Sequence, residues 1–376
     1  MAEPFKNLLN ATLVNSAATE LARHTPGFDA KAFKRLATTG LEALELKARA
    51  LHICTALEAT MPADFATAAD AFEDAMAAPV PEGSEAPDGP QPGLRGWILW
   101  PVGEYIARRG QEKPERGLAA LHALTQRFTA EFAIRPFIVH HPALSFATLA
   151  RWAADPSHHV RRLVSEGSRP RLPWGLQLKP LIADPSPTLP LLRALQDDPS
   201  DYVRRSVANH LNDIAKDHPA LVAQWLHTHL PEASKERRAL LKHASRTLIK
   251  AGDPAVLKAW GLGAAFKGNA TLTLSPKRVT LGGETTLTLH LRSASTKPQR
   301  LAVDYAVHHV KAHGGTSAKV FKGWQLELQP LAEVTLTKRH PLKPITTRRY
   351  HAGRHAVVVQ VNGGAVAEAS FELKLA

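Results

Sequence analysis

The residues of this chain best placed for chemistry are two carboxylates that stand among arginines. Glu166 follows Arg162 by one helical turn in HHVRRLVSEG, and Asp213 follows Arg205 and Asn209 at steps of four in DYVRRSVANHLNDI. One interpretation is a solvated face with ion pairs four residues apart. However, arginine, asparagine, histidine and aspartate side by side are poor choices for a merely soluble surface, where lysine and glutamate dominate. This composition therefore weakens the interpretation as a merely solvated face.

Both acids fall within an internal repeat. DPSHHVRRLVSEG begins at Asp155 and DPSDYVRRSVANHL at Asp198, and the two align without gaps as D-P-S-x-x-V-R-R-x-V. A weaker third unit, SKERRALLKHASRTLIKAG, begins at Ser234. A period near 40 residues is typical of HEAT-like repeats, which stack paired helices around a concave face. We expect the acid of D-P-S to cap each helix, and the stacking to bring Glu166 and Asp213 to one exposed surface.

The helices that carry these residues are predicted from the spacing of apolar side chains. After Asp201 an apolar face forms from Val203, Val207, Leu211 and Ile214, and the preceding repeat offers Val160, Leu163 and Val164. Residues 1–78 also read as helices. There LEALELKARALHICTALEAT predicts an apolar stripe that leaves Arg49 on the polar side; its members are Leu41, Leu44, Ala48, Leu51 and Cys54.

The period changes near residue 270, which divides the chain into two predicted domains. Residues 1–263 form an all-α HEAT-like repeat solenoid with a Pro- and Gly-rich loop or linker at 79–94. Residues 270–376 alternate apolar and polar side chains over about seven short strands, which predicts an all-β immunoglobulin-like sandwich. A turn is expected at Gly282 and Gly283, and the junction at 264–269.

Charge and composition narrow the function. The net charge is +13, and residues 267–376 carry 16 Lys and Arg against 6 Asp and Glu, which favours a polyanionic partner. The single cysteine, Cys54, excludes an internal disulfide and a multi-cysteine zinc site. No long apolar run or signal-peptide pattern is present, so we expect a cytoplasmic protein without membrane contact. The His140-His141 and His158-His159 pairs lack companions at ligand spacing, and no metal is predicted.

The loop SEGSRPRLPWG, just after Glu166, carries Arg169, Arg171 and Trp174 on a proline-stiffened turn. Spacing alone favours a packing role for Trp174. Beside a phosphate-binding groove the indole would instead contact a nucleotide.

Three long segments resemble one known family. LTQRFTAEFAIRPFI (124–138), HVRRLVSEGSRPRLPWG (159–175) and YVRRSVANHLNDIAKDHP (202–219) are similar to the AlkC branch of the AlkC/AlkD superfamily of DNA alkylation-repair glycosylases. The openings EPFKNLLNATLV and LELKARALHICTALEATMP fit the same family, and the similarity covers residues 3–260. TTRRYHAGRHAVVVQVNGG fits the immunoglobulin-like extension of some members.

The resemblance implies a monofunctional DNA glycosylase of base excision repair that needs no cofactor. Its expected substrate is duplex DNA with cationic 3-methyladenine-type lesions, and also 3-methylcytosine, handled without full base flipping. The implied catalytic residues are Glu131, Glu166 and Asp213, although FTAEF around Glu131 equally fits a buried structural motif. Trp174 matches a tryptophan near the lesion. A monomer in the bacterial cytosol or nucleoid is expected.

Basic residues of the groove and of the sandwich are expected to hold DNA phosphates, the sandwich closing around the other side of the duplex. They are Arg162, Arg169, Arg171, Arg205, Lys216, Lys242, Arg246, Arg348, Arg349, His351 and Arg354. The alternatives are a non-catalytic HEAT-repeat scaffold and a DNA-binding relative that has lost catalysis. The three acids argue against both, since carboxylates repel phosphate.

Overall fold

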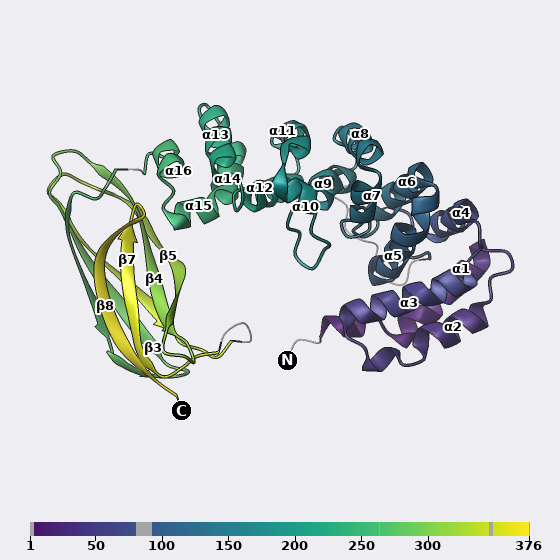
Figure 1. Cartoon of the computed structure of the whole chain (residues 1–376), viewed down its shortest axis with the longest axis horizontal. Helices are drawn as coiled ribbons and strands as arrows, with labels where there is room; N and C mark the ends of the chain where they lie inside the picture. Colours follow the sequence, from purple (N-terminus) through teal and green to yellow (C-terminus); the bar gives the residue numbers. More distant parts are fainter. Residues whose placement is uncertain (1–3, 80–91, 263, 346–348, 376) are drawn as a thin grey trace. The chain divides into compact units, whose positions relative to one another are not determined.

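The computed structural model describes residues 4–79, 92–262, 264–345 and 349–375. Its first part is helical (Figure 1). The α-helices are α1 (Ala11–His24), α2 (Ala30–Thr38), α3 (Leu46–Thr60), α4 (Phe65–Ala75), α5 (Leu99–Arg109), α6 (Pro114–Thr125), α7 (Arg135–His140), α8 (Pro142–Trp152), α9 (His158–Gly167), α10 (Lys179–Ala183), α11 (Leu189–Leu195), α12 (Asp201–Ile214), α13 (Pro219–His229), α14 (Lys235–Ala244), α15 (Arg246–Ala251) and α16 (Pro254–Ala259).

The chain forms two compact units, residues 1–217 and 218–376, so α13 to α16 group with the strands that follow. The predicted domain limits at 263 and 270 stay a prediction. Within the described residues no helix is both long and apolar enough to cross a membrane. The predicted loop 79–94 is pinned at its base by a parallel bridge between Met76 and Leu94, and its residues 80–91 lie outside the described part.

The repeat turns explain why α9 and α12 begin where they do. Asp155 Oδ1 accepts the Ser157 amide at 2.8 Å, and Asp198 Oδ1 accepts the Ser200 amide at 2.9 Å. The residues at the N-cap positions are these two serines, so the prediction that the acid itself occupies the cap was wrong. The aspartate instead closes an Asx-type turn two residues before the cap, which sets the direction in which each helix starts.

The predicted apolar faces are buried where the repeat places them. Val160 and Val164 of α9, and Val203, Val207 and Leu211 of α12, are fully or almost fully buried. The α9 helix packs against α8, α11 and α12. This packing is what a stacked helical repeat requires, because each repeat buries its apolar stripe only against its neighbours.

The predicted stripe near the N-terminus was partly wrong. Helix α3 begins at Leu46, Ala48 is exposed, and Arg49 is buried with 2% of its surface exposed. The Arg49 guanidinium donates to the backbone carbonyls of Lys6, Leu9, Glu42 and Leu44. A buried arginine can therefore take the place of water as the hydrogen-bond donor to backbone carbonyls. The spacing of apolar residues does not reveal such a role.

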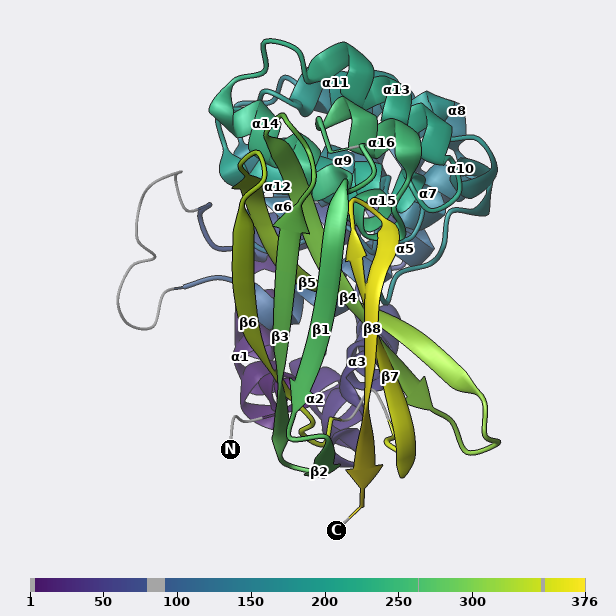
Figure 2. The ribbon, with the colours of Figure 1, turned by 90° about the vertical axis from the view of Figure 1, so that its left-hand side faces the viewer.

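The described residues from Gly268 onward form a sandwich of two sheets. Figure 2 shows β6, β3 and β1 side by side in one of them. The sheets have the orders β1-β3-β6 and β2-β8-β7-β4-β5. The strands are β1 (Gly268–Ser275), β2 (Arg278–Thr280), β3 (Glu284–Ser293), β4 (Gln299–Val310), β5 (Thr316–Leu328), β6 (Glu333–Pro341), β7 (Gly353–Val361) and β8 (Gly364–Lys374).

The sandwich core confirms the period-2 pattern. Alternate residues of β3 (Leu287, Leu289 and Leu291) and of β7 (Val357 and Val359) are buried in one cluster between the sheets. The pair Gly282 and Gly283 forms the predicted turn, with Gly282 at φ 99°, a backbone conformation that favours glycine. The fold class is thus as predicted: an all-α repeat region followed by an immunoglobulin-like all-β sandwich.

Candidate active site

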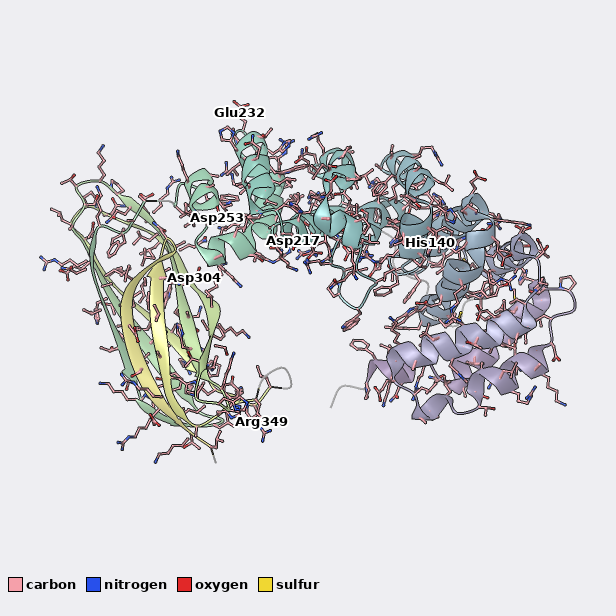
Figure 3. All side chains as sticks on the ribbon, viewed as in Figure 1. His140, Asp217, Glu232, Asp253, Asp304 and Arg349 are labelled. Atoms are coloured by element: carbon pink, nitrogen blue, oxygen red, sulfur yellow. The ribbon has the colours of Figure 1, made fainter. Side chains whose placement is uncertain are left out.

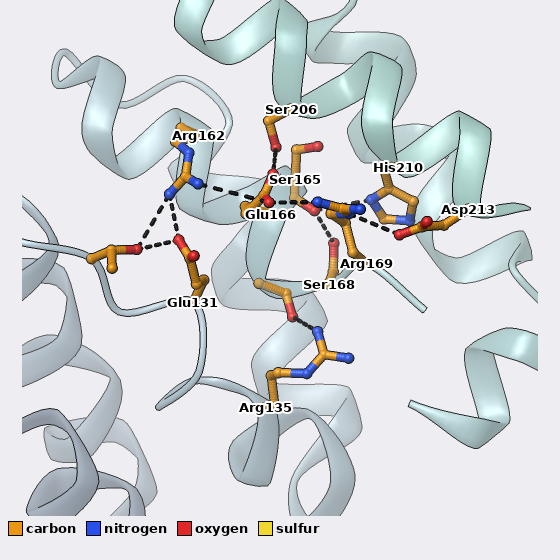
Figure 4. A network of polar contacts seen from close by, with 12 residues as sticks. Glu131, Arg135, Arg162, Ser165, Glu166, Ser168, Arg169, Ser206, His210 and Asp213 are labelled. Atoms are coloured by element: carbon orange, nitrogen blue, oxygen red, sulfur yellow. Dashed lines mark hydrogen bonds and ion pairs between the residues drawn. The ribbon is translucent and has the colours of Figure 1, made fainter. Parts of the chain in front are cut away.

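One polar network joins the ends of α9 and α12 (Figure 4). Arg169 lies at its centre, where it donates from Nη1 to Glu166 Oε1 at 2.6 Å and from Nε to Asp213 Oδ2 at 2.8 Å. Ser206 Oγ donates to the second Glu166 oxygen at 2.6 Å, and Lys216 Nζ to Asp213 Oδ1 at 3.0 Å. Two repeats therefore each contribute one carboxylate, and a single guanidinium bridges them.

The third predicted acid enters the same network through Arg162. Glu131 lies in the turn before α7, where its Oε2 accepts from Arg162 Nη1 at 2.5 Å and from the Thr129 hydroxyl. Arg162 Nη2 is 3.7 Å from Glu166 Oε1, and the guanidinium lies 4.8 Å from the centre of the Tyr202 ring. Burial opposes the charge of Arg162, but Glu131, Tyr202 and Glu166 together raise its pKa. All three predicted acids thus belong to one cluster.

The end of α9 is shaped to hold this cluster close to α7. A Cβ at Gly167 would approach Ile134 Cγ2 to 2.5 Å, so only glycine allows the two segments to approach. Across this contact the Arg135 Nη1 donates to the Gly167 carbonyl at 2.8 Å, and Arg135 Nε to the Leu176 carbonyl at 2.5 Å. Arg135 is fully buried, and its pKa is lowered to about 10 by burial and by Arg169. The S-E-G run is therefore a packing requirement as well as a carrier of Glu166.

His210 supports the network from α12. Its Nδ1 bonds to the Ser165 carbonyl at 2.9 Å, which makes Nδ1 the protonated nitrogen. The ring is fully buried, and burial lowers its pKa to about 3. His210 is therefore neutral at physiological pH, and it ties the backbone of α9 to α12 without adding charge.

The structure places the two central acids differently from the sequence expectation. Glu166 is 6% exposed and Asp213 is 2% exposed, so the prediction of one exposed surface was wrong. Each repeat packs its polar stripe against its neighbour, so only part of that stripe meets solvent. Arg169, expected to hold a phosphate, is only 7% exposed, and two of its donors are used by carboxylates. It is an internal bridge rather than a solvent-facing cation.

Arg162 belongs to the network, with 16% of its side chain exposed, and the three remaining predicted cations of unit 1 lie nearer the surface. Arg171 forms a two-point ion pair with Asp217, at 2.7 and 2.8 Å, and is partly exposed. The Arg205 side chain is 65% exposed and is 3.4 Å from Asp201. Lys216, whose ammonium binds Asp213, has 44% of its side chain exposed. These three can exchange their carboxylate partners for an anion at the surface with little repacking.

The predicted cations of unit 2 lie in two places. Lys242 donates to Gln325 Oε1 at 2.7 Å, and Arg246 donates to the His243 carbonyl at 2.6 Å; both line a cavity of 420 Å³. Arg349 and Arg354 are exposed and His351 is half-buried, while Arg348 lies outside the described residues. Figure 3 shows Arg349 toward the opposite end of the sandwich from Asp304, a residue that lines the same cavity as Lys242.

Trp174 is the most exposed large apolar side chain of the described residues, at 80%. Spacing alone favoured a packing role, and that prediction was wrong. The residue also has φ 63°, a left-handed conformation that is unusual for a bulky side chain. An exposed indole on a strained turn, a few residues from Glu166, is suited to contact a partner rather than the core of this chain.

Sequence reasoning missed several members of the network. Ser206 and His210 lie on α12 beside predicted residues, Thr129 precedes Glu131, and Arg135 follows it. The best available signal was that Arg135 interrupts an apolar run, AIRPFI, where a charge needs partners. Among the described residues no group of three or more His, Cys, Asp or Glu side chains is arranged to hold a metal ion.

Comparisons with known proteins agree with this architecture. Residues 128–248 match the model of a family described as DNA alkylation repair enzyme, and residues 269–375 one described as the C-terminal Ig-like domain of the uncharacterised protein YhaZ. Over 366 residues the chain is 36% identical to the uncharacterised protein YhaZ of Bacillus subtilis (strain 168), covering 95% of this chain and 96% of YhaZ. It is also similar to the Pseudomonas fluorescens alkylpurine DNA glycosylase AlkC bound to DNA containing an abasic-site analogue. That likeness has a TM-score of 0.89 and 35% identity, over 99% of this chain and 100% of the other.

Proposed function

The chain belongs to the AlkC family of DNA alkylation-repair proteins, and on that premise we propose that it is a monofunctional DNA glycosylase acting on cationic N3-alkylated bases. The proposed substrates are 3-methyladenine and 3-methylcytosine in duplex DNA. The observation that carries the proposal is the network in which Glu131, Glu166 and Asp213 are held together by two arginines. A protein that only binds phosphate has no use for three carboxylates at this place.

The chemistry suits acids without a cofactor. An N3-methylated base already carries positive charge, so it leaves as a neutral molecule and needs no proton from a general acid. The group that needs stabilisation is the sugar, which becomes oxocarbenium-like as the glycosidic bond breaks. Carboxylates near C1′ stabilise that charge and position or deprotonate the attacking water. We therefore expect neutral lesions and undamaged bases to be left in place.

Within the network the three acids differ in how their oxygens are used. Both Glu166 oxygens accept hydrogen bonds, from Arg169 and Ser206. Both Asp213 oxygens accept as well, from Arg169 and from the partly exposed Lys216, whereas Glu131 accepts through Oε2. In our proposal Glu166 supplies a fixed negative field, Glu131 has an oxygen that can turn toward substrate or water, and Asp213 has one when Lys216 releases its Oδ1.

Duplex DNA is the proposed partner of the basic residues. Arg171, Arg205 and Lys216 in the helical unit are exposed enough to take phosphates. In unit 2, Lys242 and Arg246 share their cavity with Lys250, Lys322 and Trp324, a set suited to a sugar-phosphate backbone. Arg349, His351 and Arg354 would act from the sandwich, and Trp174 beside the lesion. We propose a monomer that acts in the cytosol or nucleoid.

The test uses duplex DNA treated with a methylating agent. The wild-type protein and its Glu166→Gln and Asp213→Asn variants are incubated with it, and released bases are identified by mass spectrometry. We expect the wild type to release 3-methyladenine but not 7-methylguanine, and each variant to lose on the order of 10²-fold or more in rate. The matched control is Asp201→Asn, an exposed acid on the same helix α12, which is expected to keep the wild-type rate.

Two outcomes would count against the proposal. If the wild type releases no base but binds duplex DNA in a salt-dependent manner, the chain is a non-catalytic DNA-binding scaffold. If base is released equally by all variants, the reaction does not depend on this network.

A further inference from the structure

We propose that Arg169 is a positioning residue that lies as a cation between Glu166 and Asp213 and holds them at a fixed separation, and that it is not a phosphate contact. The inference rests on the proposed glycosylase function. It differs from the expectation that every arginine of the R-x-R turn holds DNA. The place of Arg169 in the fold, its partners and its burial carry the argument.

Arg169 lies directly after Ser168, the C-cap residue of α9. Its amide bonds back to the Glu166 carbonyl at 3.4 Å, and the Ser168 hydroxyl bonds to the Val164 carbonyl at 2.7 Å. The backbone that carries Arg169 is therefore held by the last turn of the helix. From there the guanidinium spans to Asp213, 44 residues further along the chain.

The contacts of the two acids show how much depends on this side chain. Among the described residues, the other charged partner of Asp213 is Lys216, a lysine with 44% of its side chain exposed, on a flexible stem. The remaining strong contact of Glu166 is the neutral Ser206 hydroxyl, since Arg162 Nη2 is 3.7 Å away. Arg169 is thus the one buried cation within hydrogen-bond distance of both acids among the described residues.

Physical chemistry gives this bridge a function. Two carboxylates brought together in a site of low polarity repel each other, and one of them takes up a proton unless a cation lies between them. Protonation would remove the negative charge that an oxocarbenium-like sugar needs. A planar guanidinium that donates from Nε and from Nη1 holds two acceptors at a defined spacing, whereas a lysine is a point charge. The bridge therefore places a positive charge between the two acids and sets their relative geometry.

Arg169 is poorly placed to bind a phosphate, because it is buried and two of its donors are engaged. Only 7% of the residue is exposed, and its Nε and Nη1 already donate to carboxylates at 2.8 and 2.6 Å. A phosphate could bind the Nη2 donors of Arg169 only by reaching a side chain of which 9% is exposed, and displacing either acid would break a buried charge-assisted pair, which is costly. Arg171, two residues later and partly exposed, is the better phosphate contact of the same turn.

The experiment compares Arg169→Met, Arg169→Lys and two matched controls in the full-length protein. Arg161→Met removes another arginine that bridges two repeats, through Asp198, but does not touch the acids. Arg171→Met removes the surface arginine of the same turn. For each protein we would measure single-turnover release of 3-methyladenine between pH 5 and 9, the melting temperature, and the salt dependence of binding to a duplex with an abasic-site analogue.

We expect Arg169→Met to lose about 10²-fold in rate while its duplex affinity and salt slope stay within twofold of wild type. The acid limb of its rate profile should move up by about one pH unit or more, because the acids are easier to protonate without the cation. Arg169→Lys should restore the position of that limb and part of the rate. Arg161→Met should lose stability without a shift of the limb, and Arg171→Met should lower the salt slope by about one.

The inference is overturned if Arg169→Met lowers the salt slope with an unmoved pH profile, which is the behaviour of a phosphate contact. It is also overturned if its rate loss equals that of Arg161→Met at matched stability, which is the behaviour of a merely structural residue. If the wild type releases no base, the proposed function fails and the inference fails with it. If the wild type is active and Arg169→Met is too, only the inference fails.

Discussion

The two copies of the D-P-S-x-x-V-R-R-x-V repeat do the same thing with their first arginine and different things with their second. Arg161 Nη1 donates to the carbonyls of Asp155 and Pro156, both at 2.9 Å. Arg204 Nη1 donates to the carbonyls of Asp198 and Pro199, at 2.6 and 2.7 Å. In each repeat this arginine closes the turn that starts its own helix.

The second arginines of the two repeats differ in their exposure and in their ion-pair partners. The Arg162 side chain is 16% exposed and pairs with Glu131, whereas that of Arg205 is 65% exposed and pairs with Asp201 on its own helix. After the shared motif, the first repeat continues S-E-G-S-R and the second A-N-H-L-N. The repeat thus encodes the scaffold, and the positions at which its copies differ encode the site.

Replacing the first arginine of each repeat should give the largest changes in the free energy of unfolding. Arg161→Met should lower the free energy of unfolding by about 3 kcal/mol, because it leaves the buried Asp198 without its two-point ion pair. Arg204→Met, which loses chiefly its bonds to two carbonyls, should cost about 1 kcal/mol. Urea denaturation followed by circular dichroism measures both. Equal costs would show that the pairing of Arg161 with the next repeat adds nothing to its role within its own turn.

A somewhat smaller effect separates the second arginines. Arg162→Met should cost about 2 kcal/mol and slow base release, since Glu131 loses its cation. Arg205→Met should change stability by less than about 0.5 kcal/mol, as is usual for an exposed side chain. The same denaturation curves, together with the base-release assay, give the comparison. A similar loss of activity in both variants would mean that the two copies contribute alike to the site.

The scaffold could be predicted from the sequence because each helix and each strand must bury its apolar residues along its whole length. This burial requires apolar residues at helical or strand spacing. Val203, Val207 and Leu211 lie where the period places them. The candidate acids could be named from their repeat positions and from the resemblance. Their environment could not, since a polar stripe on one helix carries no information about the neighbouring repeat that covers it. The burial of Glu166, Asp213 and Arg169 follows from that stacking.

Other features were beyond sequence reasoning for a different reason. The contact of Glu131 with Arg162 joins a turn to a helix 31 residues away, and the spacing of apolar residues cannot predict such a pair. Trp174 was expected to pack because its spacing alone favoured a packing role. Its exposure results from a left-handed backbone at a turn, which the residue type disfavours and only the structure reveals.

His210, in the second repeat, makes the free energy of unfolding depend on pH. It occupies the position that Gly167 holds in the first repeat, and burial lowers its pKa to about 3, below the value near 6.5 of the unfolded chain. As pH falls, the unfolded state therefore takes up a proton first, and stability is lost between about pH 6.5 and 3. From this group alone we expect the free energy of unfolding to be about 1.4 kcal/mol lower at pH 5.5 than at pH 7.5. His210→Asn, which can still donate to the Ser165 carbonyl, should remove that part of the pH dependence. If the free energy of unfolding of His210→Asn, from denaturation curves at the two pH values, differs between them as much as that of the wild type, the prediction is wrong.

The smallest expected change in stability concerns the loop that only the first repeat carries. Trp174 gains little from burial, being 80% exposed, and its φ of 63° is a conformation that glycine adopts without strain. Trp174→Gly should therefore keep or raise the free energy of unfolding, by up to about 1 kcal/mol, because relief of the strained backbone is partly offset by the greater freedom of glycine in the unfolded chain. Base release should nevertheless fall, since an exposed indole retained on a strained turn is useful only for a partner. Trp174→Asn, which tolerates the same backbone, is the control that separates loss of the ring from a change of turn. A protein that is as active without the ring as with it would place the lesion contact elsewhere and leave Glu166 and Arg169 as the specialised residues of the first repeat.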